Sequence, residues 1–364
     1  MFFCANNTAS GDKALTANTT GQSLCAFGSS ALTANTTAND NTAMGHNSMA
    51  ANTTGTLNSA FGSSTLDANT TGGNNTAIGK GALGANTTAS NNTAVGTSAL
   101  IANTTGTANV AVGAQALDEN TTASYNTAVG YTSMAAANTG SYGTAVGHQT
   151  LMSNTGGSSS TAIGNAALAY NTTGASNTAV GAQVLDANTT ASYNTGVGVS
   201  ALSATQTGAQ NTAVGTYALQ AALEDNNTAV GYAAMQNCTS GEYNVAVGHA
   251  ALDATLTGDF NVAVGVSALS TATSGHSNTG VGYLAARDVT TGTLNTAVGA
   301  YSGIQLTSAV SNTLVGNNAG YALTTGGYNV AVGHNALYTA ATSSNQIAIG
   351  YGALQVANNT SNSN

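Results

Sequence analysis

Proline and tryptophan are absent from this chain of 364 residues, and charged residues make up only 4% of it. An ordinary globular domain has ~25% charged residues, so small polar side chains must cover most of this surface. Three basic residues against twelve acidic ones give a formal net charge of −9, which argues against binding nucleic acid or anionic membranes through basic contacts. The absence of proline favours a fold in which most backbone N–H groups donate hydrogen bonds.

Cysteine is scarce as well. Cys4, Cys25 and Cys238 are far apart and form no Cys-x-x-Cys pair, so we predict no disulfide framework and expect these thiols to fill small apolar positions. Residues 1–7 lack the basic segment and the apolar run of a secretory signal. No apolar stretch reaches the ~18–20 residues of a membrane-spanning helix.

What the chain has instead is a seventeen-residue repeat that covers nearly all of it. Residues 92–108 read Asn-Thr-Ala-Val-Gly-Thr-Ser-Ala-Leu-Ile-Ala-Asn-Thr-Thr-Gly-Thr-Ala, and the pattern starts again at Asn109. Numbered from its leading Asn, each unit has a glycine at position 5. This glycine recurs every seventeen residues from Gly11 to Gly215 and, after one step of sixteen, from Gly231 to Gly350, which gives twenty-one units. A fixed short period indicates a solenoid, in which each unit contacts only its neighbours.

Positions 2 to 4 of the unit predict a β-strand. Position 4 carries the larger apolar residue and position 2 is Thr or Val, and the two share one face because side chains alternate along a strand. Since position 2 accepts Val, we expect this face to point inward and the Ala at position 3 to form a small, flat outer face. Leu or Met at position 9 supplies a second core residue, on a second short strand made by positions 8 and 9. The predicted structural residues are the core residues Val95, Leu100, Val112 and Leu117 and the corner glycines Gly96, Gly113 and Gly130.

One coil of this kind cannot be stable alone. Burial of two such side chains contributes only ~3–6 kcal/mol, whereas ordering the backbone costs ~1–2 kcal/mol for each residue. Stability must come from many stacked coils, joined by ladders of hydrogen bonds. Helix is disfavoured by the recurrent Gly, Thr and Val, and a leucine-rich repeat by the single Leu of each unit. We therefore predict an all-β parallel β-solenoid (β-roll) of twenty-one coils, about 100 Å long at ~4.8 Å per coil.

Positions 10–17 are predicted to form a loop, because Asn-Thr-Thr followed by Gly or Ala is typical of turns. The only change in length, between Leu219 and Asn227, falls in this loop. Asn-Thr-Thr marks nearly every coil of residues 1–120 and fades in residues 121–364, where the tyrosines begin. We expect residues 1–364 to be one continuous domain with these two parts. If the protein recognises a surface, the variable segment represented by residues 103–108 is the expected place.

An aromatic row is the first candidate for recognition. Its members share position 17 and lie directly before the leading Asn: Tyr125, Tyr142, Tyr193, Tyr243, Phe260 and Tyr328. Such a row suits sugars or contacts between chains, although packing of the rings on one another is the simpler interpretation.

Four of the five histidines share position 6: His46, His148, His249 and His334. They are five or six coils apart, roughly 24–29 Å, so one chain cannot bring them to one metal ion. Three copies of one histidine at the axis of a trimer could hold zinc or nickel, but a histidine tolerated at a corner is the simpler interpretation. Acidic residues occur singly, and no nucleophile–histidine–acid set is apparent. We predict no enzyme activity, no catalytic residue, no metal ion and no cofactor.

Two further features carry less weight. Asn-x-Thr sequons, such as the one at Asn103, follow automatically from the repeat and are weak evidence for glycosylation. Rows of threonine raise the question of ice binding. The threonine of position 2, however, is expected to share its face with the buried valine, and the loop pair fades after Asn120.

The unit Asn-Thr-Ala-Val-Gly-x-x-Ala-Leu-x-x-Asn-Thr-Thr-Gly resembles repeats of bacteriophage tail fibres and related bacterial surface proteins, over residues 7–364. Its Ala-Val-Gly corner is similar to the head repeats of trimeric autotransporter adhesins, which have a shorter period. The resemblance implies a left-handed parallel β-roll and chains that associate as a trimer. The signal peptide, coiled-coil stalk and membrane anchor of such adhesins are not visible, nor is the self-cleaving chaperone domain of many phage fibres. We expect a processed product, a fragment, or a subunit that stacks end to end.

These observations favour a non-enzymatic structural fibre protein, the rod of a phage tail fibre or of an extracellular appendage that contacts a host or another surface. A secreted bacterial adhesin or self-assembling extracellular filament is the first alternative, and a glycan-binding or ice-binding solenoid is the second. The expected partners are further copies of the chain and a cell-surface glycan or protein, without nucleic acid or membrane insertion. The expected location is extracellular or in a virion.

Overall fold

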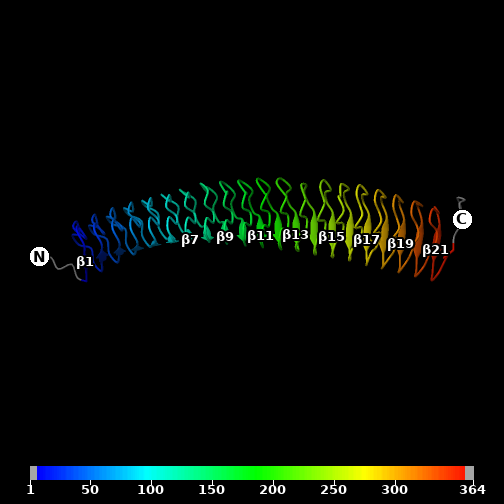
Figure 1. Cartoon of the computed structure of the whole chain (residues 1–364), viewed down its shortest axis with the longest axis horizontal. Helices are drawn as coiled ribbons and strands as arrows, with labels where there is room; N and C mark the ends of the chain where they lie inside the picture. Colours follow the sequence, from blue (N-terminus) through cyan, green and yellow to red (C-terminus); the bar gives the residue numbers. More distant parts are fainter. Residues whose placement is uncertain (1–5, 357–364) are drawn as a thin grey trace. The chain divides into compact units, whose positions relative to one another are not determined.

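The computed structural model describes residues 6–356, and in them each repeat contributes one three-residue strand and no helix (Figure 1). The 21 strands are β1 (Thr8–Ser10), β2 (Cys25–Phe27), β3 (Thr42–Met44), β4 (Ser59–Phe61), β5 (Thr76–Ile78), β6 (Thr93–Val95), β7 (Val110–Val112), β8 (Thr127–Val129), β9 (Thr144–Val146), β10 (Thr161–Ile163), β11 (Thr178–Val180), β12 (Thr195–Val197), β13 (Thr212–Val214), β14 (Thr228–Val230), β15 (Val245–Val247), β16 (Val262–Val264), β17 (Thr279–Val281), β18 (Thr296–Val298), β19 (Thr313–Val315), β20 (Val330–Val332) and β21 (Ile347–Ile349). The protein is therefore an all-β parallel β-solenoid, as the period predicts.

The described residues fall into two compact units. The first comprises residues 6–182 with 188–190 and holds β1 to β11; the second comprises residues 183–187 with 191–356 and holds β12 to β21. Within each unit every strand pairs in parallel with the next one along the chain, as β6 does with β7 through Ala94 opposite Ala111. The sixteen-residue coil keeps this register, because Thr212 lies opposite Thr228. Equal positions of the repeat consequently form rows along each unit.

The strand faces point the opposite way from the prediction. Ala94 at position 3 is fully buried, whereas Thr93 and Val95 are half-buried and lie on the outer face. Val112 in β7 likewise lies outside. The expectation that Val95 and Val112 belong to the core is therefore wrong. The position 9 residues Leu100 and Leu117 are fully buried.

The narrow interior explains why alanine and not valine points inward. Where position 8 is Val184 in place of the usual Ala, position 3 of the next coil is Gly196, on which a Cβ would lie 2.5 Å from Val184 Cγ1. At Leu314 the large residue is at position 3. Position 9 is then glycine both in the same coil (Gly320) and in the preceding coil (Gly303). A Cβ on Gly303 would lie 2.8 Å from Leu314 Cδ1. A larger side chain at one inner position thus requires a smaller one at another, as expected of a close-packed core.

The predicted second strand is also absent from the described coils, where positions 7 to 10 form turns. Ser98 and Leu100 have φ of +58° and +51°, in the left-handed region that costs a non-glycine residue ~1–3 kcal/mol. The turns still bond to their neighbours. Leu100 N donates to Ala116 O of the next coil at 3.0 Å, and Ser98 N donates to Lys80 O of the preceding coil at 3.0 Å.

Two rows of buried asparagine, at positions 1 and 12, stabilise the coils. Asn92 Nδ2 donates to Gly106 O at 2.9 Å, and Asn92 Oδ1 accepts from the backbone N of Asn109 in the next coil at 2.9 Å. Asn103 Nδ2 donates both to Asn86 Oδ1 of the preceding coil and to Gly106 O, each at 3.0 Å. The expectation that residues 103–108 form a freely variable loop is therefore wrong at Asn103 and Gly106, which are buried.

The asparagine row at position 12 gives way to apolar residues in the second unit. Cys238, Val289 and Leu306 take this position there, and each is buried. The row at position 1 continues, with side chains that also bond to one another, such as Asn261 Nδ2 to Asn244 Oδ1 at 3.1 Å. The fading of Asn-Thr-Thr along the sequence thus records a change inside the coil and not at its surface.

Candidate functional site

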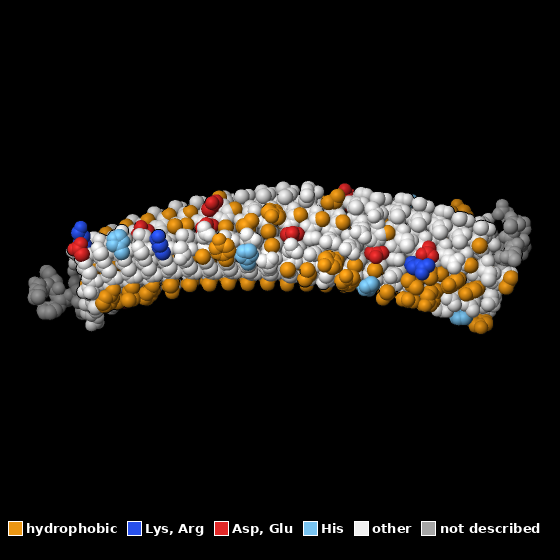
Figure 2. Space-filling view, in the orientation of Figure 1, with side chains coloured by type: hydrophobic (Ala, Val, Ile, Leu, Met, Phe, Trp, Pro, Cys, Tyr) orange, Lys and Arg blue, Asp and Glu red, His pale blue; other side chains and the backbone are white. Residues whose placement is uncertain are grey.

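The side chains at positions 2 and 4 form an outward-facing, partly exposed row on each unit, here called the strand-face stripe. Figure 2 shows hydrophobic side chains, in orange, in a row along the lower edge of the view. The position 4 members are Phe27, Met44, Phe61, Ile78, Val95, Val112, Val129, Val146, Ile163 and Val180 in the first unit, and Val197, Val214, Val230, Val247, Val264, Val281, Val298, Val315, Val332 and Ile349 in the second. No charged residue occupies position 2 or 4. The stripe was missed in the sequence because its face was assigned to the core.

The predicted aromatic row is exposed, but its rings partly cover one another. Tyr125 and Tyr142 stack with centroids 5.1 Å apart, and Tyr243 and Phe260 with centroids 5.2 Å apart. Each of these four rings is at least half exposed. Because stacked rings hide the faces that would pack on a sugar, the two pairs present mainly edges. The row is therefore a series of small aromatic contacts and not a continuous platform.

Three of the four histidines at position 6, namely His148, His249 and His334, pack on tyrosines of adjacent coils. His148 stacks on Tyr131 with centroids 5.8 Å apart and His249 on Tyr232 with centroids 5.4 Å apart. His148 Nδ1 also lies 3.1 Å from Asn165 Nδ2. Within residues 6–356 no cluster of three or more His, Cys, Asp or Glu could hold a metal ion. The histidine row in one chain is thus a packing feature.

Isolated carboxylates follow the row at position 10. Partial burial raises the pKa of Asp67, Asp118, Asp186 and Asp253 above the usual aspartate value. The folded chain therefore holds these protons more tightly than the unfolded chain, so their effect on stability becomes less favourable as pH rises through the folded pKa. Each lies in its own coil, and only Asp118 has a second carboxylate beside it, Glu119, whose negative charge also raises the pKa of Asp118. The arrangement does not supply the acid–base pair of a hydrolase.

Burial also keeps the second-unit thiol unreactive. Cys238 is 1% exposed, its Sγ donates to Gly241 O at 3.5 Å, and burial raises its pKa to about 11. At neutral pH it is a protonated thiol, which is a poor nucleophile and a poor metal ligand.

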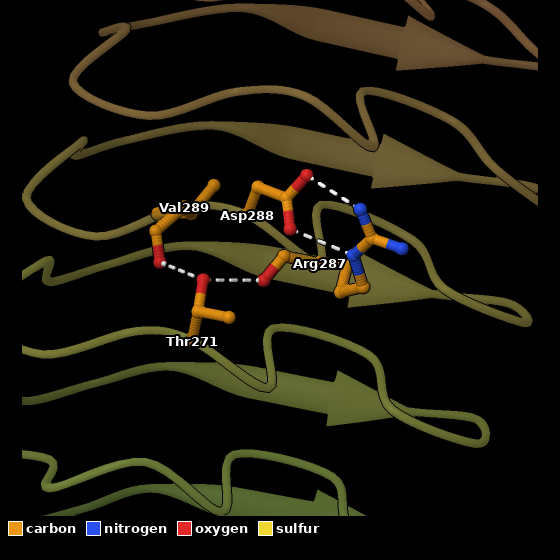
Figure 3. A network of polar contacts seen from close by, with 4 residues as sticks. All are labelled: Thr271, Arg287, Asp288 and Val289. Carbon is orange, nitrogen blue, oxygen red and sulfur yellow. Dashed lines mark hydrogen bonds and ion pairs between the residues drawn. The ribbon is translucent and has the colours of Figure 1, made fainter.

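One ion pair occurs in the part of the chain that the structure describes (Figure 3). The Arg287 guanidinium donates to both carboxylate oxygens of Asp288, each at 2.7 Å, and this hydrogen bonding raises the pKa of Arg287. Thr271 Oγ1 of the preceding coil donates to Arg287 O at 2.7 Å. Because its neighbour already neutralises it, Arg287 is not a free anion site.

The sequons at position 12 are internal. Asn86 and Asn103 are fully buried, and their amide groups are bonded along the row. An N-glycan on either side chain would require the coil to open, so these sequons belong to the structure of the coil.

The fold defines this chain as a repetitive parallel β-solenoid. It matches no model of a known protein family, and no curated protein matches it either. Among the described residues, no helix is long and apolar enough to cross a membrane. The surface carries three features that recur along the repeats, namely the strand-face stripe, the aromatic row and the histidine–tyrosine stacks of position 6.

Proposed function

We propose that this chain is a non-enzymatic structural fibre protein, the rod of a phage tail fibre or of an extracellular appendage that contacts a host or another surface. The observation that carries the proposal is the repetition of one coil contact, strand on strand and asparagine on asparagine, through each unit. A chain built this way gains length by adding coils, which suits a spacer. The resemblance of the repeat to phage fibres and surface proteins supports the same function.

The repeated surface supports a role in contact with other molecules. Exposed aromatic residues such as Tyr193, at 65% exposure, and Tyr328, at 64%, stand out from a surface of small polar groups. Aromatic side chains are enriched at protein interfaces. The fibre is proposed to act outside the cell or on a virion, as several associated copies. It is proposed to contact a cell-surface glycan or protein through the aromatic row.

Immunogold electron microscopy tests the location. Antibodies raised against the purified chain are expected to label fibres on virions, and an unrelated cytosolic protein of the same source serves as the control antigen. Label on cell-envelope filaments would favour the alternative, a secreted adhesin or extracellular filament. Label confined to the cytosol of uninfected cells would rule out both.

Ice binding is the second candidate function. The sequence argued against it because the threonine of position 2 was expected to face the core, but in the structure this threonine faces outward. Thr127, Thr144, Thr161 and Thr178 in the first unit lie on the outer face, each two residues before an outward Val or Ile. This is an uncharged row of hydroxyl and methyl groups that repeats at ~4.8 Å, and a regular row of this kind suits the regular surface of ice. Inhibition of ice growth by single chains would favour this candidate over the fibre.

A further inference from the structure

The strand-face stripe is an apolar feature that runs along the surface of each unit. At its amino-terminal end Phe27, Met44 and Phe61 are 38–41% exposed although their own coils are complete. Further along, Val230 and Val247 are each 37% exposed. Scattered apolar side chains are normal on a protein surface, but a contiguous row in register is not.

The area of the stripe is that of a stable interface. Ten coils at ~4.8 Å make it ~50 Å long in each unit, and three residues at ~3.3 Å make it ~10 Å wide. Each unit thus presents a face of ~500 Å² that combines the apolar side chains of position 4 with the Thr or Val of position 2, and it is as long as the unit itself. When the stripe of one unit covers the same stripe of a second copy, the two faces together bury ~1,000 Å², the smallest total area expected of a specific interface.

We infer that the strand-face stripe is the surface through which copies of this chain associate, stripe against stripe. The inference deepens the proposed function, on which it rests for the expectation that several chains form the fibre. An uncharged sheet face fits another sheet face, since two sheets pack ~10 Å apart through apolar side chains. A second copy offers this same face, whereas a strongly charged partner would meet no countercharge at positions 2 and 4.

The side chains of the stripe are also suited to interlock. In β2 the large Phe27 stands beside the small Cys25, and in β4 Phe61 stands beside Ser59. Each such strand presents a projection next to a hollow, which allows two copies to interdigitate. Elsewhere the stripe is mostly Thr, Val and Ile, whose branched side chains are stiff and lose little rotamer freedom when covered.

Substitution of outward valines by lysine tests the inference on the full chain. We choose Val95→Lys, Val129→Lys, Val230→Lys and Val264→Lys, in alternate coils so that the new charges are not adjacent. The matched control adds the same four charges at exposed sites away from the stripe: Ile101→Lys, Thr105→Lys, Leu223→Lys and Ser240→Lys. Native mass spectrometry and sedimentation measure the number of copies, and circular dichroism checks that the β-structure is kept.

The wild-type chain and the control are expected to have a mass that is a multiple of one chain, and the stripe variant the mass of a single chain with an unchanged β-spectrum. If the stripe variant misfolds, Val→Thr at the same four positions replaces it, because threonine keeps the branched shape. This variant is expected to raise the protein concentration at which half of the assemblies dissociate by about tenfold or more. A stripe variant that keeps the wild-type mass would overturn the inference and leave the fibre proposal standing. A wild-type monomer that inhibits ice growth would overturn both.

Discussion

A buried asparagine at position 12 stabilises most coils of the first unit through bonds that its neighbours repeat. Asn103 donates to Asn86 and accepts from Asn120 at 2.9 Å, so each side chain is both donor and acceptor in the row. The row is interrupted at Ala137, where Asn120 Oδ1 is buried without a partner among the described residues. A polar group of this kind is costly to leave unpaired, which makes the intact row sensitive to single substitutions.

Asn103→Ala is expected to destabilise the first unit by ~1–3 kcal/mol, because Asn86 Oδ1 loses its donor and Asn120 Nδ2 keeps only Ala123 O as an acceptor. Urea unfolding followed by circular dichroism measures the change. The control is Thr105→Ala, at an exposed position of the same coil. Equal midpoints for the two variants would show that the asparagine row contributes nothing to stability.

At the scale of the element, the glycine of position 5 ends each strand. Gly113 follows β7 with φ of +136°, and a Cβ there would lie 2.6 Å from the carbonyl carbon of Gly130 in the next coil. Both the backbone conformation and the close stacking of coils therefore require glycine.

Gly113→Ala is expected to lower the free energy of unfolding by at least ~2 kcal/mol, because strain and a backbone contact add together. Gly156→Ala is the matched control, since a Cβ on Gly156 would lie 3.7 Å from Thr173 Cγ2 and 3.8 Å from Thr139 Oγ1, both ordinary contact distances. Thermal unfolding of the two variants compares them. A loss of stability in Gly156→Ala as large as that in Gly113→Ala would contradict a special role of position 5.

The position of the strands could be predicted from the sequence, but their orientation could not. The recurrent glycine and the β-branched residues before it locate β6, whereas alternation alone is symmetric and does not say whether Ala94 or Val95 points inward. The combination of Val184 with Gly196 indicates that position 3 points inward. A larger side chain at position 8 requires a smaller one at position 3 only if both side chains lie in the interior. The left-handed turn at Leu100 had no such signal, since leucine rarely adopts that conformation.

The same limit applied to the candidate site. The spacing placed Tyr125 and Tyr142 in one row, and their stacking at 5.1 Å follows from that register. The strand-face stripe could not be predicted, because its valines were assigned to the core. The burial of Asn103 was missed because Asn-Thr-Thr is also typical of turns.

At the scale of the whole molecule, each coil of a unit depends on its two neighbours alone. Stability in such a chain is approximately a sum over coils and the contacts between adjacent ones. Removal of one complete repeat should therefore leave two surfaces that fit each other.

Deletion of residues 92–108 is expected to give a folded chain that is one coil shorter, with Thr76 of β5 opposite Val110 of β7 and only a small loss of stability. Deletion of residues 100–108 removes the buried Leu100 and Asn103 but leaves a partial coil, and is expected to disrupt the first unit. Circular dichroism and limited proteolysis distinguish the two. Comparable protease resistance of both deletions would refute the dependence on a complete repeat.

The ladder that pairs each strand only with the next also determines how a unit responds to tension. A coil pulled off its neighbour breaks the bonds of one contact, and the rest of the stack stays intact. Each released coil of seventeen residues adds roughly 55 Å of extended chain. A pulled unit lengthens in equal steps and dissipates the load one coil at a time, so it behaves as an extensible tether.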